Sequence, residues 1–154
     1  MKKNKVGIIA ICVGMLLCVT GCLKKTVITA EIFTTKMENN GYTVTNISDQ
    51  YKSYDYVENV LIAQSEDGYQ VEFYDLASKD DAKKLFNNNR STFEELNEGS
   101  STEVSVNMIN YSTYALTSGD CYMYISRVDD TFLYVKVNEQ YKANVKDIVE
   151  ELGY

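Results

Sequence analysis

The chain has 154 residues, of which 45% are hydrophobic and 24% are charged, a composition typical of one folded domain. Acidic residues outnumber basic residues by 22 to 15, so no nucleic-acid partner is expected, because binding to phosphates depends on lysine and arginine. The sequence has no histidine, which excludes catalytic triads and metal sites that need imidazole.

The chain starts with the pattern of an export signal. Lys2, Lys3 and Lys5 form a positively charged start, and the stretch over residues 6–23 carries no charge. An uncleaved transmembrane helix is the alternative interpretation, but this stretch is close to the shortest length that spans a bilayer. The pattern therefore favours a segment that directs export and is then removed.

The segment over residues 19–22, Val-Thr-Gly-Cys, resembles the lipobox of bacterial lipoproteins, in which a small residue precedes a cysteine that receives a diacylglyceryl group. The resemblance covers this N-terminal segment only. It implies cleavage after Gly21, which removes the signal peptide over residues 1–21, and lipidation of Cys22. Residues 22–25 would then form the lipidated cysteine and a short tether. The resemblance thus implies a lipid-anchored protein on the extracytoplasmic side of the cell membrane.

The remaining residues, 26–154, are predicted to form a single α+β domain. Apolar residues at helical spacing predict amphipathic helices, and alternating apolar residues predict strands. The predicted elements are a helix over 26–40, a strand over 42–47, a hairpin over 59–75, a helix over 79–97, strands over 102–109 and 111–116, a hairpin over 121–137 and a final helix over 139–152. An antiparallel sheet with the amphipathic helices packed on one face is the simplest arrangement that buries these apolar stripes.

A weak internal similarity predicts that the domain is a tandem duplication. Two copies of a helix-plus-three-strands unit would cover residues 26–78 and 79–137, followed by the C-terminal helix. The clearest match lies between Tyr-Lys-Ser-Tyr at 51–54 and Tyr-Ser-Thr-Tyr at 111–114.

The alternating pattern of the two hairpins predicts one apolar face and one face that is rich in tyrosine. We assign Tyr74, Tyr122, Tyr124 and Tyr134 to the tyrosine-rich face, which is expected to meet solvent. Tyrosine combines a large stiff ring with one hydroxyl group and suits the binding of sugars, peptides and proteins. The alternative is that these side chains only stabilise the sheet through cross-strand pairs. These four tyrosines are the candidate binding face.

No residue pattern identifies a catalytic, cofactor or metal site. Neighbouring acidic residues occur at several places in the sequence, but none of these pairs has the setting of a catalytic acid and base. Their spacing matches no calcium loop, and the sequence has no cluster of cysteines. The apolar strand pattern around Cys121 favours an inert buried thiol over a disulfide between two molecules.

These observations predict a membrane-anchored, non-enzymatic lipoprotein that binds an envelope component or a partner protein through its tyrosine-rich face. One alternative is a hydrolase or transferase acting on envelope material, with carboxylates that converge only in the folded protein. Another is a structural accessory subunit whose tyrosine-rich face is covered by a partner. Two close acids in a cleft would favour the enzyme, and a shallow tyrosine patch would favour binding.

Overall fold

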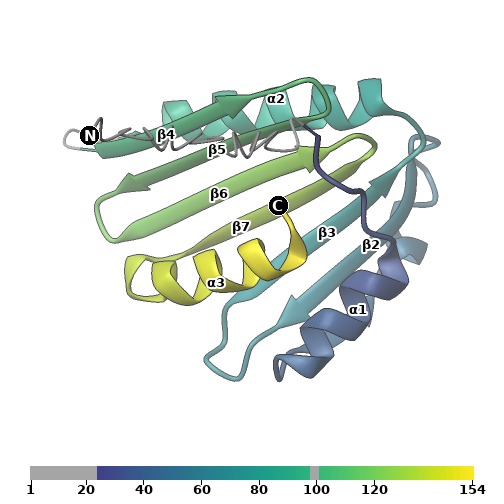
Figure 1. The fold of residues 1–154 in the computed structure, drawn as a ribbon, viewed down its shortest axis with the longest axis horizontal. Coiled ribbons are helices and arrows are strands. Elements are labelled where there is room, and N and C mark those ends of the chain that lie inside the picture. The colour runs from purple at the N-terminus through teal and green to yellow at the C-terminus, as the bar shows by residue number, and fades with distance from the viewer. Residues whose placement is uncertain (1–23, 98–100) are drawn as a thin grey trace, which may run out of the picture.

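The computed structural model describes residues 24–97 and 101–154. The expected signal peptide, its cleavage site after Gly21 and the lipidation site Cys22 lie outside the described residues. Within the described part, seven strands form one antiparallel sheet, and three α-helices pack against it (Figure 1). The expected α+β fold with an antiparallel sheet is therefore confirmed.

The elements alternate between helices and groups of neighbouring strands. In chain order they are α1 (Ala30–Asn39), β1 (Thr43–Asn46), the 3-10 turn η1 (Ser48–Tyr51), β2 (Val57–Gln64), β3 (Gln70–Leu76), α2 (Lys79–Glu95), β4 (Ser101–Asn107), β5 (Tyr111–Ser118), β6 (Cys121–Val128), β7 (Thr131–Asn138), the 3-10 turn η2 (Glu139–Tyr141) and α3 (Lys142–Leu152). The strand order across the sheet is β1-β2-β3-β7-β6-β5-β4. β3 and β7 therefore join the two halves, and β1 and β4 form the two edges.

Helix α2 shows how local sequence sets the start of an element. The Ser78 hydroxyl oxygen accepts a hydrogen bond from the Asp81 backbone N–H at 3.2 Å, and this hydroxyl donates to the Asp81 carboxylate at 2.6 Å. The pair satisfies one of the free N–H groups at the helix start. From there Ala82, Phe86 and Phe93 form the buried side of α2.

The helices lie on both faces of the sheet, and the expectation that they would share one face is wrong. Phe73 of β3 stacks on Phe33 of α1, with ring centroids 4.9 Å apart. Its neighbour along the strand, Tyr74, points to the other face and packs in the core that contains α2. In Figure 1, α1 and α3 accordingly lie in front of the sheet and α2 behind it.

The physical reason is that the central strands are apolar on both sides. Every residue of β6 from Tyr122 to Val128 is buried, so alternate side chains fill two different cores. A single layer of helices would leave one of these sets of side chains in water.

The structure does not show the expected tandem duplication. Three strands follow α1, whereas four strands follow α2 before the final helix. The two helices that start the expected repeats also lie on opposite faces of the sheet.

Candidate functional site

The four tyrosines of the predicted binding face lie on two opposite faces. Tyr122 and Tyr124 are only 2% and 7% exposed and belong to the core that contains α3. Tyr74 and Tyr134 are half-buried on the face that α2 covers. The expected solvent-facing tyrosine surface is therefore not formed by these residues.

The turn between β6 and β7 explains this difference. Asp129 and Asp130 form a two-residue connection, so Val128 pairs with Thr131. With this register Tyr124 lies opposite Val135, which places the tyrosine with the apolar face of β7. Burial raises the pKa of Tyr122 to about 12, in keeping with a hydroxyl removed from water.

Tyr74 and Tyr134 instead interact with neighbours on their own face. The Tyr74 hydroxyl donates to the Glu72 carboxylate at 2.6 Å. The Tyr134 ring packs on Phe93 of α2, with centroids 5.5 Å apart. Both side chains thus have partners within the domain.

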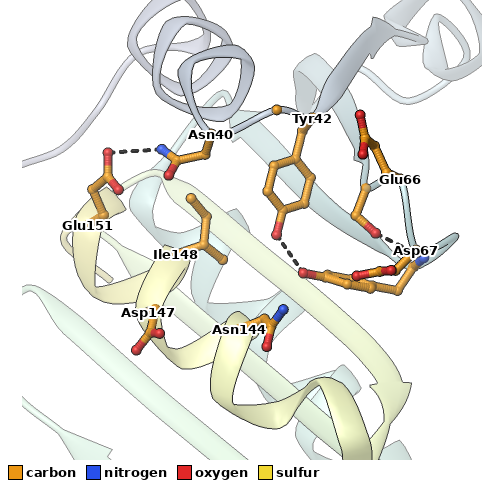
Figure 2. A pocket seen from close by; sticks show the side chains of 11 residues that line it. Asn40, Tyr42, Glu66, Asp67, Asn144, Asp147, Ile148 and Glu151 are labelled. Carbon is orange, nitrogen blue, oxygen red and sulfur yellow. Dashed lines mark hydrogen bonds between the residues drawn. The ribbon is translucent and has the colours of Figure 1, made fainter.

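A pocket lies where the end of α1, the β2–β3 turn and α3 meet, and Figure 2 shows its lining. Its volume is about 380 Å³, within the range typical of small-ligand pockets. The lining residues come from three separate segments: Asn40, Gly41 and Tyr42; Ser65, Glu66, Asp67 and Tyr69; Asn144, Asp147, Ile148 and Glu151. We call this the acidic pocket.

Hydrogen bonds at the end of α1 hold two of the three segments together. The Asn40 side-chain amide donates to the Glu151 carboxylate of α3 at 3.0 Å (Figure 2). Lys36 also donates to the Glu151 backbone carbonyl. Gly41, with φ of 81°, then lets the chain leave α1 in the left-handed region and enter β1.

The β2–β3 turn forms the third segment through its own backbone bonds. The Ser65 N–H donates to the Tyr69 carbonyl at 2.9 Å, and the Gly68 N–H donates to the Ser65 carbonyl at 3.1 Å. Glu66 and Asp67 occupy the tip of this turn and are exposed.

Three tyrosines form one wall beside the pocket. The hydroxyl groups of Tyr42 and Tyr69 are hydrogen-bonded at 2.7 Å, and the Tyr141 ring packs on Tyr69 with centroids 4.7 Å apart. Burial and the hydrogen bond with Tyr69 raise the pKa of Tyr42 well above its usual range. The wall therefore offers both ring surface and hydroxyl groups.

The pocket lining is acidic. Glu66, Asp67, Asp147 and Glu151 contribute four carboxylates, and the lining includes no lysine or arginine. Carboxylates gathered around a hollow concentrate negative potential there and attract cations. Among the described residues, no group of three or more Asp, Glu, Cys or His side chains is arranged to hold a metal ion.

Sequence reasoning missed this pocket because its residues are far apart in the chain. The turn acids and the α3 acids are separated by the whole second half of the sheet. Asp147 and Glu151 are spaced for one helix face, but that spacing also occurs on ordinary solvated helices. Only the packing of α3 beside α1 brings the acids around one hollow.

A second hollow of about 270 Å³ lies beside α2 and is lined by Tyr56, Asp81, Lys84, Leu85 and Asn88. Its lining has charges of both signs, from Asp81 and Lys84, and one aromatic residue, Tyr56, whose ring contacts Tyr54. Cys121, the free cysteine of the described part, is half-buried.

No protein-family model, curated protein or solved structure matches the chain. Within residues 24–97 and 101–154, none of the helices has the length and apolar character needed to cross a membrane. The chemistry of the site therefore has to be argued from its own residues.

Proposed function

We propose that this protein is an extracytoplasmic lipoprotein, anchored through Cys22, whose acidic pocket binds a cationic organic group of an envelope component or partner protein. The observation that carries the proposal is the combination of four carboxylates with a tyrosine wall in one pocket without basic lining residues. The pocket takes the role that the sequence had suggested for the strand tyrosines.

Charge and shape support a cationic ligand. A positively charged amine or guanidinium in the pocket is attracted by the negative potential of the carboxylates that line it, Glu66 on the turn and Asp147 on α3 among them. An amine placed against a tyrosine ring gains a further contribution of about 0.5–2 kcal/mol. Since all four carboxylate side chains belong to exposed residues, binding is expected to weaken as salt is added.

The anchored location rests on the sequence pattern at the N-terminus. The basic start, the uncharged stretch and the Val-Thr-Gly-Cys segment together support cleavage after Gly21 and lipidation of Cys22. Incorporation of labelled fatty acid into the full chain, with loss of label and release from the membrane in Cys22→Ala, tests this part of the proposal.

The ligand-binding part is tested with a tri-lysine peptide as the probe and calorimetry as the measurement. The double variant Glu66→Gln, Asp147→Asn removes one carboxylate from each wall and should weaken binding at least about tenfold, or about 1.4 kcal/mol. The matched control Glu58→Gln, Asp80→Asn removes two exposed carboxylates outside the pocket lining. Equal binding by the two double variants would contradict the proposal.

The pocket also favours one alternative, an envelope-acting hydrolase or transferase. Carboxylates from the β2–β3 turn and from α3 line the same pocket, and catalysis by an acid and a base draws on two carboxylates in one cleft. Turnover of cell-wall fragments that is lost in Asp147→Asn, with fragment binding retained, would favour this enzyme over the binding protein.

A further inference from the structure

Strand β4 is an unprotected edge. In the described part of the chain, β4 ends the sheet, and all seven of its residues are exposed. Its pairing with β5 runs without a bulge from Ser101 to Asn107. Natural edge strands are usually short, bulged or heavily charged, which prevents pairing with other chains. β4 has one charged residue, Glu103, and Arg90 of α2 lies 3.8 Å from its carboxylate.

Exposed apolar side chains gather along this edge. Val104 and Val106 belong to β4, and Ile109 lies in the turn to β5 with 73% of its surface exposed. Leu96, also exposed, lies just beyond the end of α2. In the described part of the chain, more of the exposed large apolar side chains lie along the β4 edge than beside any other strand.

The hairpin geometry identifies which backbone groups face outward. The Met108 N–H donates to the Tyr111 carbonyl at 2.8 Å, so these two residues form a hydrogen-bonded pair. Hydrogen-bonded and non-hydrogen-bonded pairs alternate along an antiparallel ladder. Val104 therefore directs its N–H and C=O groups toward β5. Glu103 and Ser105 direct theirs to the free edge, as do Ser101 and Asn107.

We infer that β4 pairs antiparallel with β4 of a second copy of this chain, about a two-fold axis at Val104. This register places Glu103 opposite Ser105 of the second copy, and Ser101 opposite Asn107. All four residues with outward backbone groups then form hydrogen-bonded pairs. The two sheets become one continuous sheet, with the α2 helices on one face and the α1 and α3 helices on the other.

The side chains of β4 are self-complementary in this register. The two Val104 side chains meet at the axis, and each Thr102 lies beside Val106 of the other copy, which are favourable pairs of β-branched residues. The single acid, Glu103, faces a serine instead of a second glutamate. A shift of the axis to Glu103 would place the two glutamates opposite each other and leave residues of both strands unpaired. The strand that can pair with the whole length of β4 is therefore β4 of a second copy.

Helices α1 and α3 lie away from the β4 edge. α2 packs over β6 and β7 through Phe86 and Phe93, and α3 packs beside β7 on the other face. In Figure 1, α2 runs behind β4, and its Arg90 lies 3.8 Å from the Glu103 carboxylate of β4. In the paired dimer the two α2 helices would therefore flank the two-fold axis on one face of the sheet.

The test is disulfide cross-linking of the full chain under mild oxidation. Two Val104→Cys residues would face each other as a non-hydrogen-bonded pair, with Cα atoms about 4.5 Å apart, within the range of disulfides. The matched control is Val106→Cys, on the same face of the same strand. Two residues at position 106 would be four positions apart along the paired strands, roughly 13 Å, which is too far to bridge.

The expected result is a covalent dimer that forms at least about tenfold faster in Val104→Cys than in Val106→Cys or the parent chain, which contains the native cysteines. A mixture of Thr102→Cys and Val106→Cys should also cross-link, although each alone should not. Equal rates for Val104→Cys and Val106→Cys, or cross-links of Val104→Cys only to other proteins, would overturn the inference. The readout does not involve the acidic pocket, so it is independent of the proposed ligand.

Discussion

Tyr122 was expected on a solvent-facing binding surface, but the structure places it in the core. Its ring is almost fully buried and contacts the core between the sheet and α3, and Lys142 of α3 lies 5.4 Å from the ring centroid. The side chain therefore holds α3 on the sheet, and α3 in turn supplies the acids of one pocket wall.

Replacement of Tyr122 by alanine should therefore destabilise the whole domain. We expect a loss of about 3–5 kcal/mol in the free energy of unfolding, because a large buried ring leaves a cavity. The matched control is Tyr54→Ala, since Tyr54 is 48% exposed. Urea unfolding followed by circular dichroism measures both, and similar losses in the two variants would contradict the buried role of Tyr122.

Sequence patterns could identify the apolar and tyrosine positions of each strand, but not the way in which two strands combine. Tyr124 and Tyr134 have the same alternation in the sequence, and the two-residue turn at Asp129 and Asp130 decides that they face opposite sides. The acidic pocket depends on contacts between α1 and α3, such as that of Asn40 with Glu151, which no local pattern contains.

The hydrogen bonds at the start of α2 connect a local sequence pattern to the stability of the domain. Ser78 caps the helix by accepting a hydrogen bond from the Asp81 N–H, and its hydroxyl donates to the Asp81 carboxylate. The hydrogen bond from Ser78 and the nearby Lys84 amino group hold the pKa of Asp81 below its usual range.

This lowered pKa predicts a pH-dependent contribution of the cap. In the unfolded chain an aspartate titrates near pH 3.9, so the Asp81 carboxylate stabilises the fold above that pH. The contribution is lost as the pH falls through the lower pKa of the folded state. The stability difference between the parent chain and Asp81→Asn should therefore be present at about pH 7 and shrink strongly by about pH 3.

Denaturant unfolding at the two pH values measures this difference. Ser78→Ala removes the main hydrogen-bond donor to Asp81, so it should reduce the same pH dependence and cost about 1 kcal/mol at neutral pH. A difference that is equal at both pH values would contradict the role of the carboxylate.

The positions of the helices and hairpins could be predicted because each has its own periodicity and end signals. α2 was expected over 79–97 and lies at Lys79–Glu95. The assignment of helices to faces could not be predicted, because Phe73 and Tyr74 are both large and apolar enough for a core. Where both faces of a strand are apolar, alternation no longer distinguishes inside from outside.

At the scale of the molecule, the N-terminal segment and the acidic pocket lie at opposite ends of the strands. The Lys25 N–H donates to the Asn110 side chain at 3.1 Å, and the Asn110 amide donates back to the Lys25 carbonyl at 2.8 Å. Asn110 lies in the β4–β5 turn. Its backbone carbonyl accepts a hydrogen bond from the Asp129 N–H, so this turn lies beside the β6–β7 turn. Leu76, at one end of β3, donates its N–H to the Asp130 carbonyl of the β6–β7 turn. The other end of β3 adjoins the β2–β3 turn, which lines the pocket.

This arrangement predicts a fixed orientation on the membrane if Cys22 carries the lipid. A fluorescent label at Ile109→Cys should be quenched strongly by nitroxide-labelled lipids, whereas the same label at Asp67→Cys should be quenched weakly. Asn110→Ala removes the contacts with Lys25 and should reduce the contrast between the two labels. Equal quenching at both positions in the parent chain would contradict the orientation.

The contact between Asn110 and Lys25 also limits what the pocket can reach. Few residues separate Lys25 from Cys22, the predicted lipidation site, and β3 alone spans roughly 20 Å between its two ends. If Cys22 carries the lipid, so short a tether holds the Lys25 end of the domain at the bilayer and the pocket at the far end of the strands, away from the lipid. The cations that reach the pocket would then belong to molecules that approach from the wall or from outside the cell.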